Sequence, residues 1–258
     1  MEDFLPKFPA FLLIFVRVTS FFIMLPLFSY RTIPTSHKVG FAFFLSLMMF
    51  FGMETPTLEV NGAYYLLIIK EAMVGLFIGF LAYMLFSAVQ IAGGLIDFQM
   101  GFAIANVVDP QTGTQSPLTG QYLNIIALFF LLAVNGHHLL LDGVFYSYQF
   151  IPLDQAWVNF GDEKIMEYAG KAFASMFAIA FQMSIPVVGA IFLVDVALGI
   201  VARTVPQLNI FVVGVPVKIV VGLIMLIIVM GAIMASVSNL FSTILTTMRD
   251  MMNLMGGS

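Results

Sequence analysis

The chain has 258 residues, of which 61% are hydrophobic and only 9% are charged, with a net charge of −4 and no cysteine. Soluble domains carry about 25% charged and about 45–50% apolar residues, so both a soluble fold and a disordered chain are excluded. A mean hydropathy of +1.04 is typical of an integral membrane protein. The lack of cysteine excludes disulfides and thiol chemistry, and no basic run favours nucleic-acid binding.

Six apolar stretches follow one another along the chain, and each is continuous, which favours helices over strands. Crossing the hydrocarbon core takes about 20 helical residues, so the second stretch is short for a span. If each stretch crosses once, the chain makes six crossings. We therefore expect an all-α integral membrane protein of about six hydrophobic helical segments, in a single domain over residues 1–258. The stretches are 8–28, 39–53, 64–92, 122–141, 172–201 and 210–241.

Residues 92–122 interrupt this apolar pattern with a segment rich in Gly, Pro, Gln and Asn. The segment holds two charged residues, Asp97 and Asp109, and no Lys or Arg. A lipid-facing segment cannot hold such irregular backbone, because its N–H and C=O groups would lack partners. The composition is typical of a loop that is tucked into protein or lines a pore, with an ordinary connection between two helices as an equal alternative.

Four ionisable residues lie inside apolar stretches, namely Arg17, Lys70, Glu71 and Asp195. Each would cost about 2.5–3.5 kcal/mol at the centre of a bilayer, so they should face protein or water and form pairs. Lys70 and Glu71 are adjacent and point to different sides of a helix, so we expect each to find its partner elsewhere. Arg17 with Asp195, or Lys70 with another acid, are candidate pairs. The four residues indicate either a proton or ion relay or, as the favoured interpretation, structural pairs between helices.

Small residues and prolines within the stretches bear on helix packing. Gly75 and Gly79 form a GxxxG pattern, which lets two helix backbones approach closely. Pro186 and Pro216 should kink the fifth and sixth helices. The chain offers no nucleophile with a base, no cluster of metal ligands and no phosphate-binding loop. We therefore expect no enzymatic activity, cofactor or metal.

Three blocks of the sequence resemble the FliR family, whose members are subunits of the flagellar type III protein export gate and have homologues in injectisomes. The resemblance covers essentially the whole chain, and the blocks come in the expected order. The blocks are AGGLIDFQMGFAIANVVDPQTGTQSPLTGQ (92–121) with NGHHLLLDG (135–143), then Asp195, Gly199 and Arg203 with PQLNIFVVGVPVK (206–218), and Arg17 with Pro26 and Pro34 near the N-terminus.

The resemblance implies a non-enzymatic subunit of the gate through which unfolded flagellar proteins leave the cytoplasm. The subunit would lie in the bacterial inner (cytoplasmic) membrane, at the basal body of the flagellum. The implied partners are FliP and FliQ, which form the pore with it, and FlhB and FlhA, which complete the export apparatus. The implied fold is a set of helical hairpins in a helical assembly, with a FliP-like N-terminal part and a FliQ-like C-terminal part. Such hairpins would be buried partly against other subunits and partly against lipid.

The resemblance also implies a plug, a loop that enters the pore and helps to close it, at residues 106–122. This position agrees with the uncharged, turn-forming composition of the segment. The candidate plug and gating residues are Asn106, Asp109, Pro110, Gln111, Thr112, Gly113, Thr114, Gln115, Ser116, Pro117, Gly120 and Gln121.

Seven charged residues are expected to be buried and to have a structural role. For Asp195 and Arg203 the separation of eight residues does not place both on one helical face, so their direct pairing stays open. The seven residues are Arg17, Lys70, Glu71, Asp97, Asp195, Arg203 and Lys218.

A stand-alone secondary transporter or ion channel is the alternative function. Its binding or relay site near the middle of the membrane would consist of Arg17, Lys70, Glu71 and Asp195. Transport by the purified chain alone would favour this alternative, whereas an export gate requires FliP and FliQ. An intramembrane enzyme would need a catalytic pair or a metal cluster, and the sequence offers neither.

Overall fold

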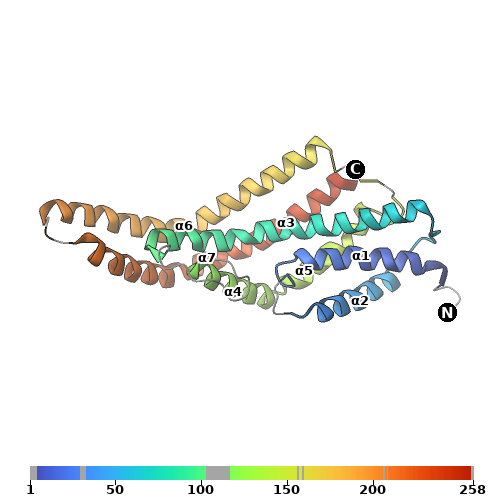
Figure 1. Cartoon of the computed structure of the whole chain (residues 1–258), viewed down its shortest axis with the longest axis horizontal. Helices are drawn as coiled ribbons and strands as arrows, with labels where there is room; N and C mark the ends of the chain where they lie inside the picture. Colours follow the sequence, from blue (N-terminus) through green and yellow to red (C-terminus); the bar gives the residue numbers. More distant parts are fainter. Residues whose placement is uncertain are drawn as a thin grey trace. The chain divides into compact units, whose positions relative to one another are not determined.

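The computed structural model describes residues 5–29, 33–102, 117–155, 157–158, 160–205, 207 and 209–256. All the regular structure within these residues is helical, as the continuous apolar stretches predict (Figure 1). A short 3-10 turn at Leu5–Lys7 precedes the first α-helix. The α-helices are α1 (Phe8–Met24), α2 (Thr35–Gly52), α3 (Gly62–Met100), α4 (Leu118–Ala133), α5 (Gly136–Phe150), α6 (Glu163–Thr204) and α7 (Ile210–Gly256).

Fewer helices qualify as membrane spans than the six crossings expected from hydropathy. Among the described residues, three helices are long and apolar enough to cross a membrane, namely α3, α6 and most of α7, or four if α4 and α5 form one broken span. The fourth apolar stretch is divided because Asn135 adopts a left-handed backbone conformation, with φ of 56°. Asn tolerates this conformation better than most residues, so it separates α4 from α5 within an apolar run.

The chain divides into two compact units, each assembled from segments that are distant in sequence. Unit 1 contains residues 1–85, 135–173 and 242–258, and unit 2 contains residues 86–134 and 174–241. The helices α3, α6 and α7 each contribute residues to both units. Because the segments alternate between the units, the units do not follow one another along the chain, and the single-domain interpretation stays a prediction.

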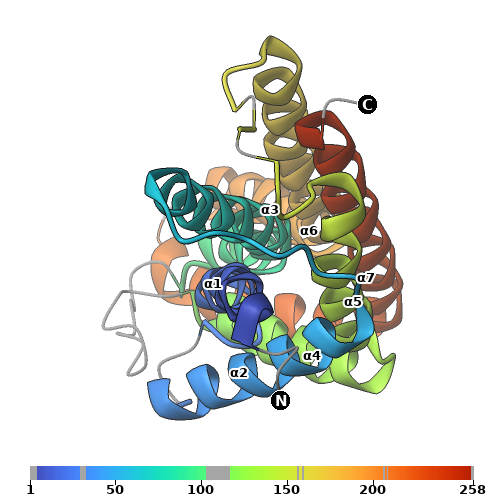
Figure 2. The same cartoon turned by 90° about the vertical axis from the view of Figure 1, so that its right-hand side faces the viewer.

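In unit 1, α1 and α2 lie side by side and are held together by aromatic rings (Figures 1 and 2). Phe11 packs edge-to-face on Phe43 and Phe50, with ring centroids 5.5 and 5.9 Å apart. Phe22 and Phe41 stack with centroids 5.6 Å apart. Each aromatic pair contributes about 0.5–1.5 kcal/mol beyond the burial of its area. The abundant Phe residues therefore build a hairpin from two helices that do not qualify as membrane spans.

The GxxxG pattern of α3 packs against α1. A Cβ atom added at Gly75 would collide with the carbonyl oxygen of Arg17 and the hydroxyl of Ser20. A Cβ atom at Gly79 would lie 2.8 Å from the carbonyl oxygen of Phe21. The two helix backbones are therefore too close for any side chain larger than hydrogen at these two positions.

In unit 2, residues 174–204 of α6 and 210–241 of α7 run side by side and are joined by a short turn (Figure 1). In the most apolar 18-residue stretch of each of these two helices, only 11% and 17% of the stretch is buried, compared with 61% for α3. Pro186 and Pro216 lie inside helices that continue on either side of them. Large apolar side chains such as Leu193 and Ile227 remain exposed. These two helices thus present an apolar surface that lipid or other protein chains can cover.

We expect Gly75→Ala to destabilise the protein, because the new methyl group forces α1 and α3 apart. Overpacking of this kind costs about 1–3 kcal/mol. Gly170→Ala on α6 is the matched control, since a Cβ atom there meets nothing within 4 Å. Thermal unfolding in mild detergent should give a lower Tm for Gly75→Ala alone. Equal Tm values for the two variants would contradict the close approach of α1 and α3.

Candidate functional site

The core of unit 1 contains a charge cluster that joins α1, α3 and α5. Arg17 is completely buried, and its guanidinium group forms a two-point ion pair with the equally buried carboxylate of Glu71, through Nε to Oε2 and through Nη2 to Oε1 at 2.9 Å. Nη1 donates to the Ser147 hydroxyl and Nη2 to the Ile151 carbonyl, both at 2.9 Å. The guanidinium carbon lies 4.0 Å from the centre of the Tyr148 ring. A planar guanidinium suits this combination of fork-shaped pairing and stacking.

Lys70 binds the same carboxylate of Glu71 and completes the cluster. This contact corrects one prediction made from the sequence. The Nζ atom of Lys70 lies 2.6 Å from Oε1 of Glu71, although the two residues are adjacent in α3. The long lysine side chain bends back to its neighbour, and it also donates to the carbonyl groups of Pro152 and Leu153 at 2.8 and 3.3 Å. Lys70 and Glu71 therefore do contact each other, contrary to the expectation that each finds its partner elsewhere, and Glu71, not Asp195, is the partner of Arg17.

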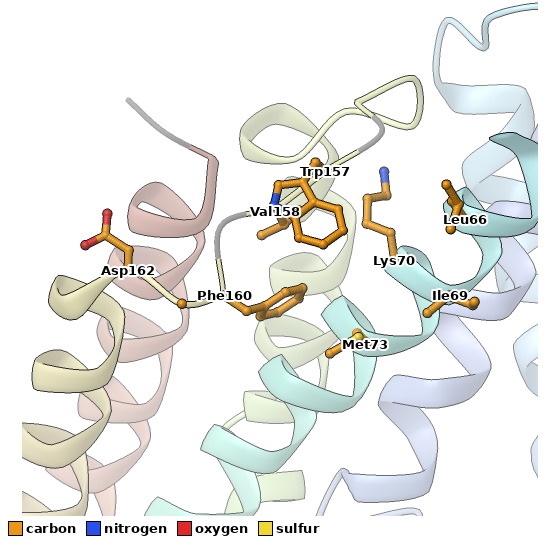
Figure 3. Close-up of a pocket in the computed structure, with 9 residues that line it drawn as sticks. Leu66, Ile69, Lys70, Met73, Trp157, Val158, Phe160 and Asp162 are labelled. Carbon is orange, nitrogen blue, oxygen red and sulfur yellow. The ribbon is translucent and has the colours of Figure 1, made fainter.

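A pocket of about 610 Å³ lies beside this cluster, between α3 and the connection that follows α5. Leu66, Ile69 and Met73 form its wall on α3, and Trp157 and Phe160 face them from the connection (Figure 3). Lys70 also lines the pocket, but its three N–H groups are already bound by Glu71, Pro152 and Leu153. The described wall of the pocket is therefore mainly apolar and offers no uncommitted ammonium group to a ligand.

In unit 2, the buried carboxylate of Asp97 binds the N-terminus of α4. The helix begins after Pro117, which provides no side-chain cap. Asp97 supplies the missing acceptor from α3, because Oδ2 accepts the Thr119 amide at 2.9 Å and Oδ1 accepts the Thr119 hydroxyl. The N-terminal amides of a helix lack intrahelical partners and carry a partial positive charge, which favours an anion at this place.

The last turn of α3 is held against its neighbours in unit 2. The Gly101 amide donates to the Asp97 carbonyl at 3.1 Å, and φ of +90° at Gly101 turns the chain out of the helix. Met100 is fully buried and packs on Gly222 of α7, where an added Cβ atom would lie 2.8 Å from the Met100 side chain. Gly93 approaches the backbone of Gly120 closely enough to exclude any Cβ atom. These contacts fix the end of α3 relative to α4 and α7.

Asp195 forms a second polar cluster in unit 2. Its Oδ1 atom lies 2.7 Å from Nζ of Lys218 on α7, and its Oδ2 atom accepts from Nε2 of Gln99 on α3 at 2.8 Å. Arg203 does not belong to this cluster; it is exposed in the last turn of α6, where a positive charge is favourable. The expectation that Arg203 is buried is therefore wrong, and Asp195 and Lys218 are partly exposed in this chain.

Most of the candidate plug falls outside the residues that the structure describes. Pro117 is the N-cap residue of α4, Gly120 faces Gly93, and the Gln121 amide donates to the Pro117 carbonyl at 2.8 Å. The plug candidates outside the described residues are Asn106, Asp109, Pro110, Gln111, Thr112, Gly113, Thr114, Gln115 and Ser116.

The neutral partners of the charged groups are not predicted from the sequence. Ser147 and Tyr148 bind Arg17, Gln99 binds Asp195, and Thr119 binds Asp97. Each is a polar or aromatic residue next to an apolar run, which is the only signal that could have pointed to it. Neutral polar residues are too common in such positions for that signal to select them.

Known proteins are similar to this chain over two thirds of its length or more. The family model described as bacterial export proteins, family 1, matches residues 8–244. The flagellar biosynthetic protein FliR of Bacillus subtilis (strain 168) is 57% identical over 259 residues, which cover 100% of both chains. The protein of the same name from Escherichia coli (strain K12) is 26% identical over 92% of this chain and 90% of its own. The Yop proteins translocation protein T of Yersinia pestis is 30% identical over 67% of this chain and 66% of its own.

We expect Glu71→Gln to destabilise the protein strongly, because it leaves the buried Arg17 and Lys70 without a negative partner. Breaking a buried ion pair in this way costs about 3–5 kcal/mol. Glu167→Gln is the matched control, since Glu167 and Lys171 form an ion pair that is exposed to solvent. Thermal unfolding in mild detergent should show a large loss of Tm for Glu71→Gln and almost none for the control. A similar Tm for both variants would mean that the cluster does not hold unit 1 together.

Proposed function

The chain belongs to the family of bacterial export proteins, family 1, which includes the FliR proteins, and from this membership we propose that it is a subunit of the flagellar type III export gate. In this role it forms the protein-conducting pore together with FliP and FliQ, and unfolded flagellar proteins pass through that pore. The observation that carries the proposal is 57% identity to a FliR protein over the whole length of both chains.

The general role of the protein follows from family membership and from the hydropathy of the chain. The protein is a membrane-embedded component of the flagellar export apparatus, and its family is not an enzyme family. It works with other components of that machinery. The relative from Yersinia pestis is named as a translocation protein, which agrees with a role in type III secretion.

The named partners and the exact membrane belong to the proposal. We place the protein in the inner membrane, at the basal body, with FliP and FliQ as direct neighbours and FlhB and FlhA beyond them. Support comes from α6 and α7, whose most apolar windows are only 11% and 17% buried within this chain. Asp195 and Lys218 are partly exposed on this otherwise apolar hairpin, and a polar pair in such a place is best covered by protein rather than by lipid alone.

The proposed plug is the segment 106–122. Its support is composition, since a nearly uncharged run of Gly, Pro, Gln and Asn inside an apolar membrane chain needs a protein-lined or water-filled cavity. On either side of residues 103–116, the described residues Gly101 and Pro117 lie next to Asp97 and Gly94, respectively. In the resting gate the plug blocks the lumen, and each of its polar contacts contributes about 0.5–1.5 kcal/mol net, so an arriving substrate can displace it.

The alternative of a stand-alone transporter finds less support in the charged residues. Arg17, Lys70 and Glu71 satisfy one another inside unit 1, while Asp195 is bound by Lys218 and Gln99 inside unit 2. Each cluster is complete within its own unit, as expected for structural pairs. A transporter would move a solute when the purified chain alone is reconstituted in liposomes, and the gate would not.

Deletion of residues 112–116 should raise ion leakage through the assembled gate, because the proposed plug no longer fills the lumen. The deletion leaves Pro117 and the N-terminus of α4 intact. Leakage is measured as the ion sensitivity of cells that express the variant together with FliP and FliQ, and recovery of the complex serves as the assembly control. Normal leakage in a fully assembled complex would show that the segment is not a plug.

Asp195→Asn should weaken assembly more than it changes the proton dependence of export, because the carboxylate pairs with Lys218 and, within the part of the chain that the structure describes, does not continue into a chain of titratable groups. The measurement compares the yield of complex with export at several external pH values. Lys218→Met removes the same pair from the other side and should lower the yield similarly. Intact assembly combined with a loss of proton dependence would instead favour a relay.

A further inference from the structure

We propose that an acidic pocket in unit 1 binds an arginine or lysine side chain of a neighbouring subunit in the pore complex. The pocket has a volume of about 360 Å³ and lies between the connection after α2 and the connection after α5. The inference rests on the proposed function, because it requires that the chain is a subunit of an assembly. It adds to that function a contact site on unit 1 and the chemistry of the group that fills it.

Two carboxylates of this pocket have no ion pair in the part of the chain that the structure describes. Glu54 and Asp154 both line the pocket, and both are exposed. Lys70 attracts Asp154 from a longer distance, but its ammonium group is already bound by Glu71 and by two backbone carbonyl groups. The pocket therefore carries negative charge that no cation of the described residues contacts directly.

The two connections that form the pocket are acidic along their whole length. Residues 53–61 include Glu54 and Glu59, residues 151–162 include Asp154 and Asp162, and neither stretch contains Lys, Arg or His. A surface of one charge attracts a partner of the opposite charge and disfavours a partner of the same charge. The group that complements this pocket is therefore cationic.

The hydroxyl group of Thr55 is an independent observation that points to a ligand. Thr55 is only 8% exposed and lines the pocket next to Glu54. Among the described residues, no group forms a hydrogen bond with this hydroxyl. Polar side chains that are largely buried normally have a hydrogen-bond partner. An N–H donor placed in the pocket would bind the Thr55 oxygen and the two carboxylates together.

A basic side chain suits the pocket better than a metal ion does. Ca²⁺ takes about 6–8 oxygen ligands. The carbonyl groups of Pro152 and Leu153 already accept hydrogen bonds from Lys70, which leaves two carboxylates and one hydroxyl as the ready oxygen ligands. The wall also has an apolar part at Met53 and Pro56. Arginine and lysine bury their methylene stems along such apolar surface while the charged group stays at polar partners.

The test uses a single thiol in the pocket wall, since the chain has no cysteine. Pro56→Cys places the thiol in the wall, and Thr57→Cys places it at the next position, which is exposed and does not line the pocket. The rate of labelling by a small neutral maleimide is measured for the purified full chain and for its complex with FliP and FliQ. The ratio of the two rates is compared, so that a change in the reactivity of the thiol itself cancels.

We expect Pro56→Cys to be labelled about tenfold more slowly in the complex than in the chain alone, the factor that corresponds to one charge-assisted contact over the pocket. Thr57→Cys should show little change between the two samples. Addition of Glu54→Gln and Asp154→Asn to Pro56→Cys should remove most of the protection. Glu59→Gln, which removes an exposed carboxylate of the same connection, is the matched control and should leave the protection in place.

Equal labelling of Pro56→Cys in the chain and in the complex overturns the proposal. Protection that survives the loss of both carboxylates overturns it as well, because the pocket would then be covered without a cation. If the variant that lacks both carboxylates is not recovered with FliP and FliQ, Asp154→Asn alone decides the question. Its Tm as an isolated chain, which should equal that of the parent, shows that it folds.

Two further outcomes separate this inference from its alternatives. If Ca²⁺ or Mg²⁺ slows the labelling of Pro56→Cys in the isolated chain and EDTA restores it, the pocket is a metal site and the proposal is wrong. Failure of the parent chain to form a complex with FliP and FliQ would contradict the proposed function and this inference with it. A complex that forms without protecting the pocket would overturn this inference alone.

Discussion

The carboxylate of Glu71 binds two cations inside an apolar helical core, and the arrangement of unit 1 depends on it. Arg17 reaches it from α1, Lys70 reaches it from within α3, and both cations continue to groups at the end of α5. A buried charge is expensive in an apolar medium unless its partners are in place, so these contacts must form together. The same requirement explains why glycines lie where α1 and α3 are in contact. The close approach of the two helix backbones at Gly75 brings Arg17 within reach of Glu71.

The polar residues of unit 2 meet the same physical requirement by other means. Asp97 is neutralised by the amide groups and the positive end of α4, and Asp195 by an ammonium group and a side-chain amide. Each of these two carboxylates has partners within unit 2, as the Glu71 carboxylate has its partners within unit 1. Charged residues inside this protein therefore hold helices together, which suits the proposed role of a subunit that shapes a conduit for another chain.

The contrast between α3 and the α6–α7 hairpin connects the fold to the proposed assembly. The apolar window of α3 is mostly covered by its own chain, whereas α6 and α7 keep most of theirs exposed. Hydropathy alone cannot distinguish a surface that faces lipid from one that faces another apolar subunit, because both environments favour the same side chains. The charged pair on the exposed hairpin is the feature that favours a protein neighbour.

The sequence by itself determined the membrane class, the helical fold, the family and the position of the polar segment, because composition and motif order are local properties. The continuous apolar runs around 8–28 and 210–241 became helices, and Gly75 and Gly79 became a packing face. Only the tertiary structure decided that Asn135 divides the fourth run, that Lys70 bends back to Glu71 and that Asp97 caps α4. These outcomes depend on which helices become neighbours and on how a flexible side chain uses the space between them. The spacing of residues along one helix determines neither the neighbouring helices nor the path of such a side chain.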